Sequence, residues 1–135
     1  MTPDHEAAIR DSFARQTMME TFGARMAALG PGTCRIEAPI LPGARQQHGV
    51  AHAGLTFALG DSAAGYAALT LMPEGREVMT SEMKINLLRP AAGKLMAATG
   101  EVIKAGRRLT VVKAEVRVDG ALVAVLLGTM VPLTE

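Results

Sequence analysis

Tryptophan is absent from this chain of 135 residues, and aromatic residues make up only 3% of it. The single cysteine, Cys34, cannot form an internal disulfide, so nothing indicates an oxidising compartment and we expect a cytoplasmic protein. Lys and Arg number 14 against 13 Asp and Glu, a net charge of +1. The basic surplus that a nucleic-acid backbone would attract is therefore lacking, and we expect no nucleic-acid partner. The first residues are polar and acidic, which predicts no signal peptide.

The hydrophobic content is nevertheless 49%, supplied by Ala, Val, Leu and nine Met residues. Such a composition suits a closely packed core, or a binding surface that must fit flexible apolar ligands. The length is that of one domain. Because no linker, repeat or low-complexity stretch divides the sequence, we expect a single domain over residues 1–135.

The hydrophobic spacing predicts helices first and strands afterwards. Apolar residues near helical spacing over residues 4–28 predict one or two short amphipathic helices, within an N-terminal helical segment over residues 1–30. Alternation of apolar and polar residues predicts strands over residues 33–41, 78–87 and 109–118. Two more strands are predicted over residues 94–104, which a turn at residues 105–107 ends, and over residues 121–132, which are nearly continuous in Val and Leu. In the second of these strands the odd positions are apolar, which places Met79 and Met83 in the core. The order predicts an α+β fold, with an antiparallel sheet wrapped around one central helix.

That central helix is predicted over residues 50–72, where the stretch from Leu55 to Met72 carries only one charge, Asp61. A run of about 18 apolar or small residues is long enough to suggest a transmembrane span. A charge at its middle costs about 2.5–3.5 kcal/mol on insertion scales, and Ala and Gly contribute little hydrophobicity. We therefore expect a helix buried on all faces in a protein without a membrane partner.

Two features of this helix could carry chemistry. The first N–H groups of a helix have no internal partners, and small residues at Ala53 and Gly54 would let a ligand oxygen approach them as in an oxyanion hole. The alternative is a helix start with small residues for tight packing. Asp61 is a reasonable general base or nucleophile, because burying a carboxylate is expensive without a partner or a task. The alternative is an Asp that caps a loop or pairs across a subunit contact.

The spacing of these two features has a consequence for assembly. Gly54 and Asp61 are seven residues apart, or about 10.5 Å along a helix axis. Reacting atoms must lie within about 3–3.5 Å, so the two groups of one chain cannot act on one carbonyl carbon. If both act, two copies of the chain must share the site, which predicts a two-fold dimer with antiparallel central helices.

Three motifs stand out in the sequence: residues 48–54 (HGVAHAG), 59–63 (LGDSA) and 83–91 (MKINLLRPA), followed by hairpin-linked strands that carry Gly106 and Arg107. These motifs resemble those of the hotdog-fold acyl-CoA thioesterases, in particular the PaaI-like (phenylacetate-degradation) group. The resemblance covers the chain from Thr33 onward. It implies a hotdog fold that assembles as a dimer or a dimer of dimers, and that hydrolyses acyl-CoA thioesters without a metal or other cofactor.

The resemblance also implies roles for particular residues. The family's carboxylate corresponds to Asp61 and its oxyanion-hole amide to Ala53. The polar residue that could hold the attacking water or the thioester corresponds to Gln46, and the assisting hydroxyl to Thr80, with Ser81 as its neighbour. Two positions depart from the family pattern. Ala53 replaces Gly, so that a positive φ would cost about 1–2 kcal/mol, and Gln46 replaces Asn.

Other polar residues admit two interpretations each. His48 and His52 have no evident third partner for a metal, and His52 is better explained as a structural group hydrogen-bonded at the helix start. Lys104, Arg107 and Arg108 could contact the phosphates of coenzyme A or could form a solvated turn.

The sequence therefore predicts a homo-oligomeric acyl-CoA thioesterase with a small-molecule substrate. One alternative is a non-catalytic acyl-CoA binding or sensing module of the same fold. Another is a hotdog dehydratase, which would need a His beside the carboxylate, and none is evident.

Overall fold

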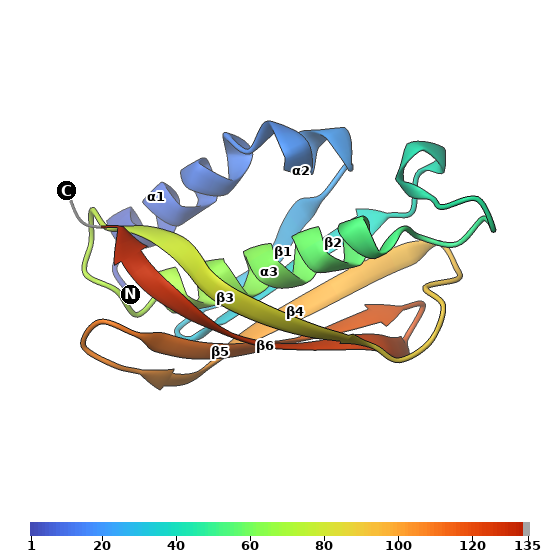
Figure 1. The fold of residues 1–135 in the computed structure, drawn as a ribbon. Coiled ribbons are helices and arrows are strands. Elements are labelled where there is room, and N and C mark those ends of the chain that lie inside the picture. The colour runs from blue at the N-terminus through green and yellow to red at the C-terminus, as the bar shows by residue number, and fades with distance from the viewer. Residues whose placement is uncertain (134–135) are drawn as a thin grey trace.

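A six-stranded antiparallel sheet curves around one long helix in the computed structural model, which describes residues 1–133 (Figure 1). The helix, α3, spans Ala53–Leu69. The strand order across the sheet is β1-β2-β4-β5-β6-β3, so that β1 and β3 are the edges. The strands are β1 (Arg25–Gly30), β2 (Thr33–Pro39), β3 (Glu77–Leu87), β4 (Leu95–Ala105), β5 (Thr110–Val118) and β6 (Ala121–Leu133). The predicted α+β architecture is confirmed.

Helix α3 lies very close to the sheet because its contact face consists of small residues. Ala63, Ala64 and Ala67 are fully buried there. A Cβ atom added at Gly100 of β4 would lie 2.5 Å from the backbone nitrogen of Ala64 and would overlap the carbonyl of Ala63. The absence of a side chain at Gly100 therefore allows backbone-to-backbone packing, which explains how a core with so few aromatic residues fills its volume.

The N-terminal segment was predicted to be helical as far as residue 30, and this is wrong for its last part. Helices α1 (Pro3–Ala14) and α2 (Thr17–Thr21) form as expected, but residues 25–30 form the edge strand β1. Gly23 adopts a left-handed conformation with φ +67°, which ends the helical path. Met26 continues the helical spacing of the preceding apolar residues by coincidence, because a hairpin pairs β1 with β2.

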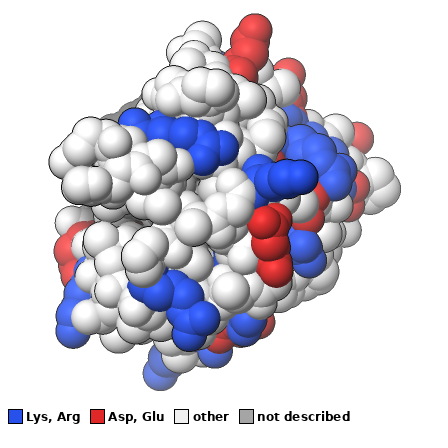
Figure 2. Space-filling view, turned by 90° about the vertical axis from the view of Figure 1, so that its right-hand side faces the viewer, with Lys and Arg blue, Asp and Glu red and all other residues white. Residues whose placement is uncertain are grey.

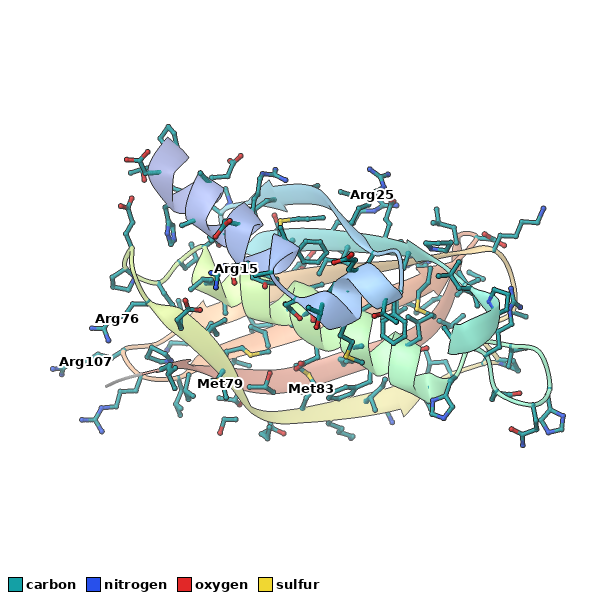
Figure 3. All side chains as sticks on the ribbon, turned by 90° about the horizontal axis from the view of Figure 1, so that it is seen from above. Arg15, Arg25, Arg76, Met79, Met83 and Arg107 are labelled. Atoms are coloured by element: carbon teal, nitrogen blue, oxygen red, sulfur yellow. The ribbon has the colours of Figure 1, made fainter. Side chains whose placement is uncertain are left out.

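Strand β3 contains an irregularity that changes which side chains face the helix. Its pairing with β6 shifts register between Thr80 and Glu82, so Ser81 is the extra residue of a β-bulge. After the bulge Met83 packs against the core as predicted, but before it the inward side is that of Val78. Met79 was predicted to lie in the core and is instead 53% exposed. Both methionines are labelled along β3 in Figure 3.

Helix α1 covers the side of α3 that faces away from β5 and β6 (Figure 1). The ring of Phe13 packs edge-on against that of Tyr66, with centroids 6.0 Å apart. The His5 Nε2 atom lies 3.0 Å from the carbonyl oxygen of Leu69 at the end of α3. These contacts fix α1 across the C-terminal half of the central helix.

Among the described residues, 1–133, none of the helices combines the length and the apolar character needed to cross a membrane.

The close approach at Gly100 can be tested by substitution. We expect Gly100→Ala to lower the free energy of unfolding by at least about 1–3 kcal/mol, because the added methyl group must push α3 away from β4. Urea unfolding of the purified protein measures this change. Gly43→Ala is the matched control, since an added Cβ there meets nothing within 4 Å. Equal unfolding midpoints for the two variants would contradict the packing argument.

Candidate functional site

The N-terminus of α3 has one amide that is held and one that is free. His52 is the N-cap residue, and its ring Nδ1 accepts a hydrogen bond of 2.7 Å from the N–H of Gly54. A Cβ atom at position 54 would lie 2.9 Å from that nitrogen, which explains the glycine. Within residues 1–133 the N–H of Ala53 has no acceptor. The free donor at this helix end is therefore that of Ala53, while Gly54 serves the cap.

The backbone at Ala53 carries no strain. Across the described residues Asp119 is the sole non-glycine residue with a positive φ. The cost anticipated for an alanine at this position consequently does not arise, because residue 53 is simply the first residue of the helix.

A hollow of about 510 Å³ lies beside this free amide, and we call it the amide hollow. Arg89 is the charged residue among those that line it, and no carboxylate does so. Its other lining residues are Gln46, Val50, Ala51, His52, Ala53, Thr56, Leu87, Leu88, Pro90, Ala91 and Val123. Figure 2 views the molecule from this end, where uncharged surface predominates and basic side chains are scattered over it.

Gln46 is held in place by its own loop. Its side-chain oxygen accepts a hydrogen bond from the N–H of His48, and its backbone N–H donates to the carbonyl of Val50 at 2.9 Å. The guanidinium of Arg45 braces the same loop by donating to the carbonyls of Gly49 and Ile40 at 2.6 and 2.7 Å. Within residues 1–133 the side-chain NH₂ of Gln46 has no acceptor, so it remains available to a ligand.

Asp61 lies two turns along α3 and is half-buried. Its Oδ1 accepts a hydrogen bond of 2.7 Å from the hydroxyl of Thr80, and its Oδ2 has no partner within the described part of the chain. Burial raises the pKa of the Asp61 carboxyl, and the hydrogen bond from Thr80 opposes that rise. The bulge at Ser81 turns the side chain of Thr80 toward the helix. Thr80 and Asp61, both predicted site residues, are therefore in contact.

A second hollow, of about 420 Å³, opens beside Asp61, and we call it the carboxylate hollow. Its lining residues are Ser12, Gln16, Asp61, Ser62, Gly65, Tyr66, Glu77, Val78, Met79, Thr80 and Met130. Ser12, Gln16 and Tyr66 were not among the residues predicted from the sequence. Ser12 and Gln16 are polar residues four positions apart, close to the apolar Phe13, but nothing in the sequence pairs them with Tyr66.

The two hollows are separate within one protomer and share no lining residue. Asp61 follows Ala53 by eight residues, about 12 Å along the axis. Contrary to the prediction, α3 is not buried on all faces: one stripe is less covered because β3 is the edge strand beside it. The stripe consists of Ala53, Gly54, Phe57, Ala58, Asp61 and Ser62.

Comparison with known proteins gives the family. Residues 48–124 match the family model described as the thioesterase superfamily. A thioesterase family protein from Silicibacter pomeroyi is 42% identical, over 97% of this chain and 99% of that one, with a TM-score of 0.92. The chain belongs to the thioesterase superfamily.

Two further solved structures share the fold. A variant of the phenylacetic acid degradation protein PaaI from Thermus thermophilus is 28% identical, over 87% of this chain and all of the other, with a TM-score of 0.79. The PaaI protein from the phenylacetic acid degradation operon of Escherichia coli is 21% identical over 96% of this chain and 94% of that one. Its TM-score of 0.87 shows the shared fold. This thioesterase is therefore a thioester hydrolase with the hotdog fold.

The remaining predicted residues of this thioesterase lie apart from both hollows. Ser81 is exposed at the bulge. Arg107 and Arg108 line a third hollow of about 230 Å³ near the C-terminal end of α3, together with Arg76, and Lys104 is not among its lining residues. Figure 3 shows Arg76 and Arg107 at the same end of the molecule. Within residues 1–133, no three His, Cys, Asp or Glu side chains come together as a metal site would require.

The raised pKa of Asp61 predicts a gain of stability when its charge is removed. A raised folded-state pKa means that ionisation destabilises the fold, by an amount that grows as pH rises from the ordinary carboxyl pKa through the raised one. We expect Asp61→Asn to melt higher than the wild type at neutral pH, with the difference shrinking in acid, because Thr80 can still donate to the amide oxygen. Thermal melts at both pH values measure this. A lower melting temperature of the variant at neutral pH would show that the carboxylate stabilises the fold instead.

Proposed function

We propose that this thioesterase hydrolyses acyl-CoA thioesters to a free acid and coenzyme A, at a site shared by two protomers. One observation carries the proposal. The half-buried carboxylate of Asp61 and the free N–H of Ala53 lie on the same uncovered stripe of α3, in separate hollows about 12 Å apart along the helix. Each hollow holds half of what thioester hydrolysis needs.

A two-fold dimer would unite the halves. Two α3 helices that pack antiparallel along this stripe would bring Asp61 of each protomer to the other's Ala53, which gives two equivalent sites. The exposure of Met79 and Leu87 on β3, at 53% and 56%, supports the same arrangement, because a second copy beside this edge would cover them. We propose a dimer, or a dimer of such dimers.

The proposed reaction uses one proton acceptor and one oxyanion donor. Asp61 takes a proton from water as the water oxygen attacks the thioester carbonyl carbon, and Thr80 holds the carboxylate in position. The partner's Ala53 donates its N–H to the resulting oxyanion, and Gln46 beside it can orient the water or the thioester. Collapse of the intermediate breaks the C–S bond and releases the thiolate of coenzyme A. In the alternative, Asp61 attacks the carbonyl carbon directly and water hydrolyses the resulting anhydride.

Arginines at the end of α3 would receive the phosphates of coenzyme A. Leu69, the last residue of α3, follows Asp61 by eight residues, about 12 Å of helix, and Leu71 of the third hollow lies two residues further along the chain. The pantetheine arm has about thirteen chain bonds, equal to just over four extended residues, so it spans about 15 Å and is long enough for this separation. We assign the phosphates to Arg107 and Arg108, with Lys104 adjoining them on β4 and Arg76 as a third guanidinium.

Replacement of Asp61 should remove turnover without removing the fold. We expect Asp61→Asn to lower kcat at least about 100-fold, the scale of a general-base contribution. In the wild type, kcat should fall in acid as Asp61 becomes protonated, and because burial raises this pKa the loss should begin at a higher pH than for an exposed carboxyl. Release of thiol from a panel of acyl-CoA esters measures both effects. Thiol release at a wild-type rate by the variant would exclude Asp61 from the mechanism.

Mixed dimers test whether two chains share each site. Ala53→Pro removes the free N–H alone, because proline is well accepted at the first residue of a helix and His52 already has the conformation that precedes proline (φ −64°, ψ 142°). We expect Ala53→Pro to lower kcat about 100- to 1,000-fold, and Ala53→Gly, which keeps the N–H, to remain active. Equal amounts of Ala53→Pro and Asp61→Asn chains, refolded together, should recover about one quarter of wild-type activity, since half of the dimers would carry one intact site of two.

Formation of the mixed dimers is followed with mass-tagged chains. Suppose that tagged mixed dimers form while activity stays at the level of the two parent variants. In that case the N–H of Ala53 and the carboxylate of Asp61 do not meet across the dimer, and the shared-site mechanism is wrong.

A further inference from the structure

The loop that joins β2 to α3 carries an arginine that the proposed reaction does not use. This loop projects from the right-hand end of the molecule in Figure 1 and adjoins the amide hollow. The guanidinium of Arg45 donates from two different nitrogen atoms, from Nη1 to the carbonyl of Gly49 at 2.6 Å and from Nη2 to the carbonyl of Ile40 at 2.7 Å. One side chain therefore ties together two points of the backbone on opposite sides of the loop.

These two points differ in how firmly the rest of the fold holds them. Ile40 is 4% exposed, and its N–H donates to the carbonyl of Lys94 at 2.9 Å, so it is anchored beside the sheet. Gly49 belongs to a turn over residues 46–49, where its φ is +85° and an added Cβ atom would meet nothing within 4 Å. The guanidinium thus connects a turn with little packing of its own to a fixed point of the fold.

The other hydrogen bonds of this turn, within residues 1–133, are made inside the loop. The N–H of Gln46 donates to the carbonyl of Val50 at 2.9 Å, and the N–H of Gly49 donates to the carbonyl of Gln46 at 3.0 Å. Both bonds would persist if the turn moved as a unit. The bond from Arg45 to Ile40 is therefore what fixes the turn relative to the end of β2.

The start of α3 is fixed without the guanidinium. The N–H of His52 donates to the carbonyl of Ala44 at 2.9 Å, and the His52 ring caps the N–H of Gly54. The side chain of Arg45 takes part in neither bond. Loss of the guanidinium should therefore move the turn, and Gln46 with it, while the free N–H at the helix start stays in place.

We propose that Arg45 is a positioning residue for Gln46, whose side-chain NH₂ it holds toward the amide hollow. The inference rests on the proposed hydrolysis, in which Gln46 acts at the shared site. The side-chain oxygen of Gln46 already accepts a hydrogen bond from the N–H of His48, so the group that it offers to a ligand is a donor. A donor stabilises the negative charge that develops on the thioester oxygen, and its misplacement should lower kcat rather than weaken substrate binding.

The bridge requires the shape of the guanidinium and not only its charge. Arginine presents its N–H groups as a planar fork whose two ends can reach two carbonyls, whereas the ammonium of lysine is a single point. Arg45→Lys keeps the positive charge and cannot keep both bonds. This variant separates the bridge from a long-range attraction of the coenzyme A phosphates, which either cation would supply.

The experiment measures kcat and KM for the acyl-CoA ester that the wild type hydrolyses fastest. We expect Gln46→Ala to lower kcat roughly tenfold, the scale of one lost hydrogen bond. Because Arg45 acts through Gln46, Arg45→Met should lower kcat about three- to tenfold and no further than Gln46→Ala, with KM within about twofold of the wild type. Arg45→Lys should lose nearly as much. The double variant, Arg45→Met with Gln46→Ala, should match Gln46→Ala alone.

Hydrogen exchange and a matched control show where the change occurs. In Arg45→Met the N–H groups of Gln46 and Gly49 should exchange faster, while that of Gly54 keeps its rate. Arg15→Met is the control, because it removes a guanidinium from an exposed ion pair with Asp11, and Arg15 lines neither the amide hollow nor the carboxylate hollow (Figure 3). It should change neither kcat nor these exchange rates.

A double variant in which the two losses multiply would show that Arg45 acts independently of Gln46, and the inference would be wrong. A wild-type kcat in Arg45→Met or in Arg45→Lys, or a loss in Arg45→Met confined to KM, would also overturn it. Failure of the proposed function has a different signature. A wild-type kcat in Gln46→Ala would remove Gln46 from the reaction, and absence of thiol release by the wild type would contradict the hydrolysis itself; the inference would fall with either.

Discussion

The contact between the backbone of α3 and that of β4 is the constraint on which the other features of the structure depend. Gly100 leaves no side chain between the two backbones, and Ala63, Ala64 and Ala67 supply none from the helix that would hold them apart. A helix embedded this deeply is surrounded by strands on most sides. The stripe of α3 that is less covered carries Ala53 and Asp61. Because the opposite face of the helix is packed against the sheet, that packing sets the orientation of the stripe and so the positions of both residues.

Asp61 shows a conflict between stability and function on that stripe. A carboxylate that is half-buried in an apolar helix has a raised pKa and costs folding free energy when ionised. The single hydrogen bond from Thr80 offsets part of the cost and leaves Oδ2 free to accept a proton. More partners would stabilise the ion and make it a weaker base. The β-bulge of β3 provides this one bond and no more within the described chain.

The sequence predicted the central helix, Asp61 and the helix-start amide because each has a local signal: a long apolar run, an isolated charge and a motif that resembles a family's. It could not predict β1, because Met26 fits the helical spacing and only pairing with β2 decides against it. Nor could alternation locate the bulge at Ser81, which reverses the facing of Met79. The cluster of Ser12, Gln16 and Tyr66 joins Tyr66 to residues 54 and 50 positions before it, and it arises only from the docking of the N-terminal helical segment on α3.

At the start of α3, likewise, one N–H group stabilises the fold and its neighbour remains for the proposed reaction. His52 occupies the N–H of Gly54, and glycine is needed there because the ring lies where a side chain would begin. The cap holds the first turn in shape and, within residues 1–133, leaves the N–H of Ala53 without an acceptor. The hydrogen bond between His52 and Gly54 thus determines that the N–H of Ala53 is the group left for an oxyanion. The same holds for the stripe as a whole: if β3 had a neighbour that covered α3, the protomer would be more stable alone, but no thioester could reach Ala53 and Asp61 together.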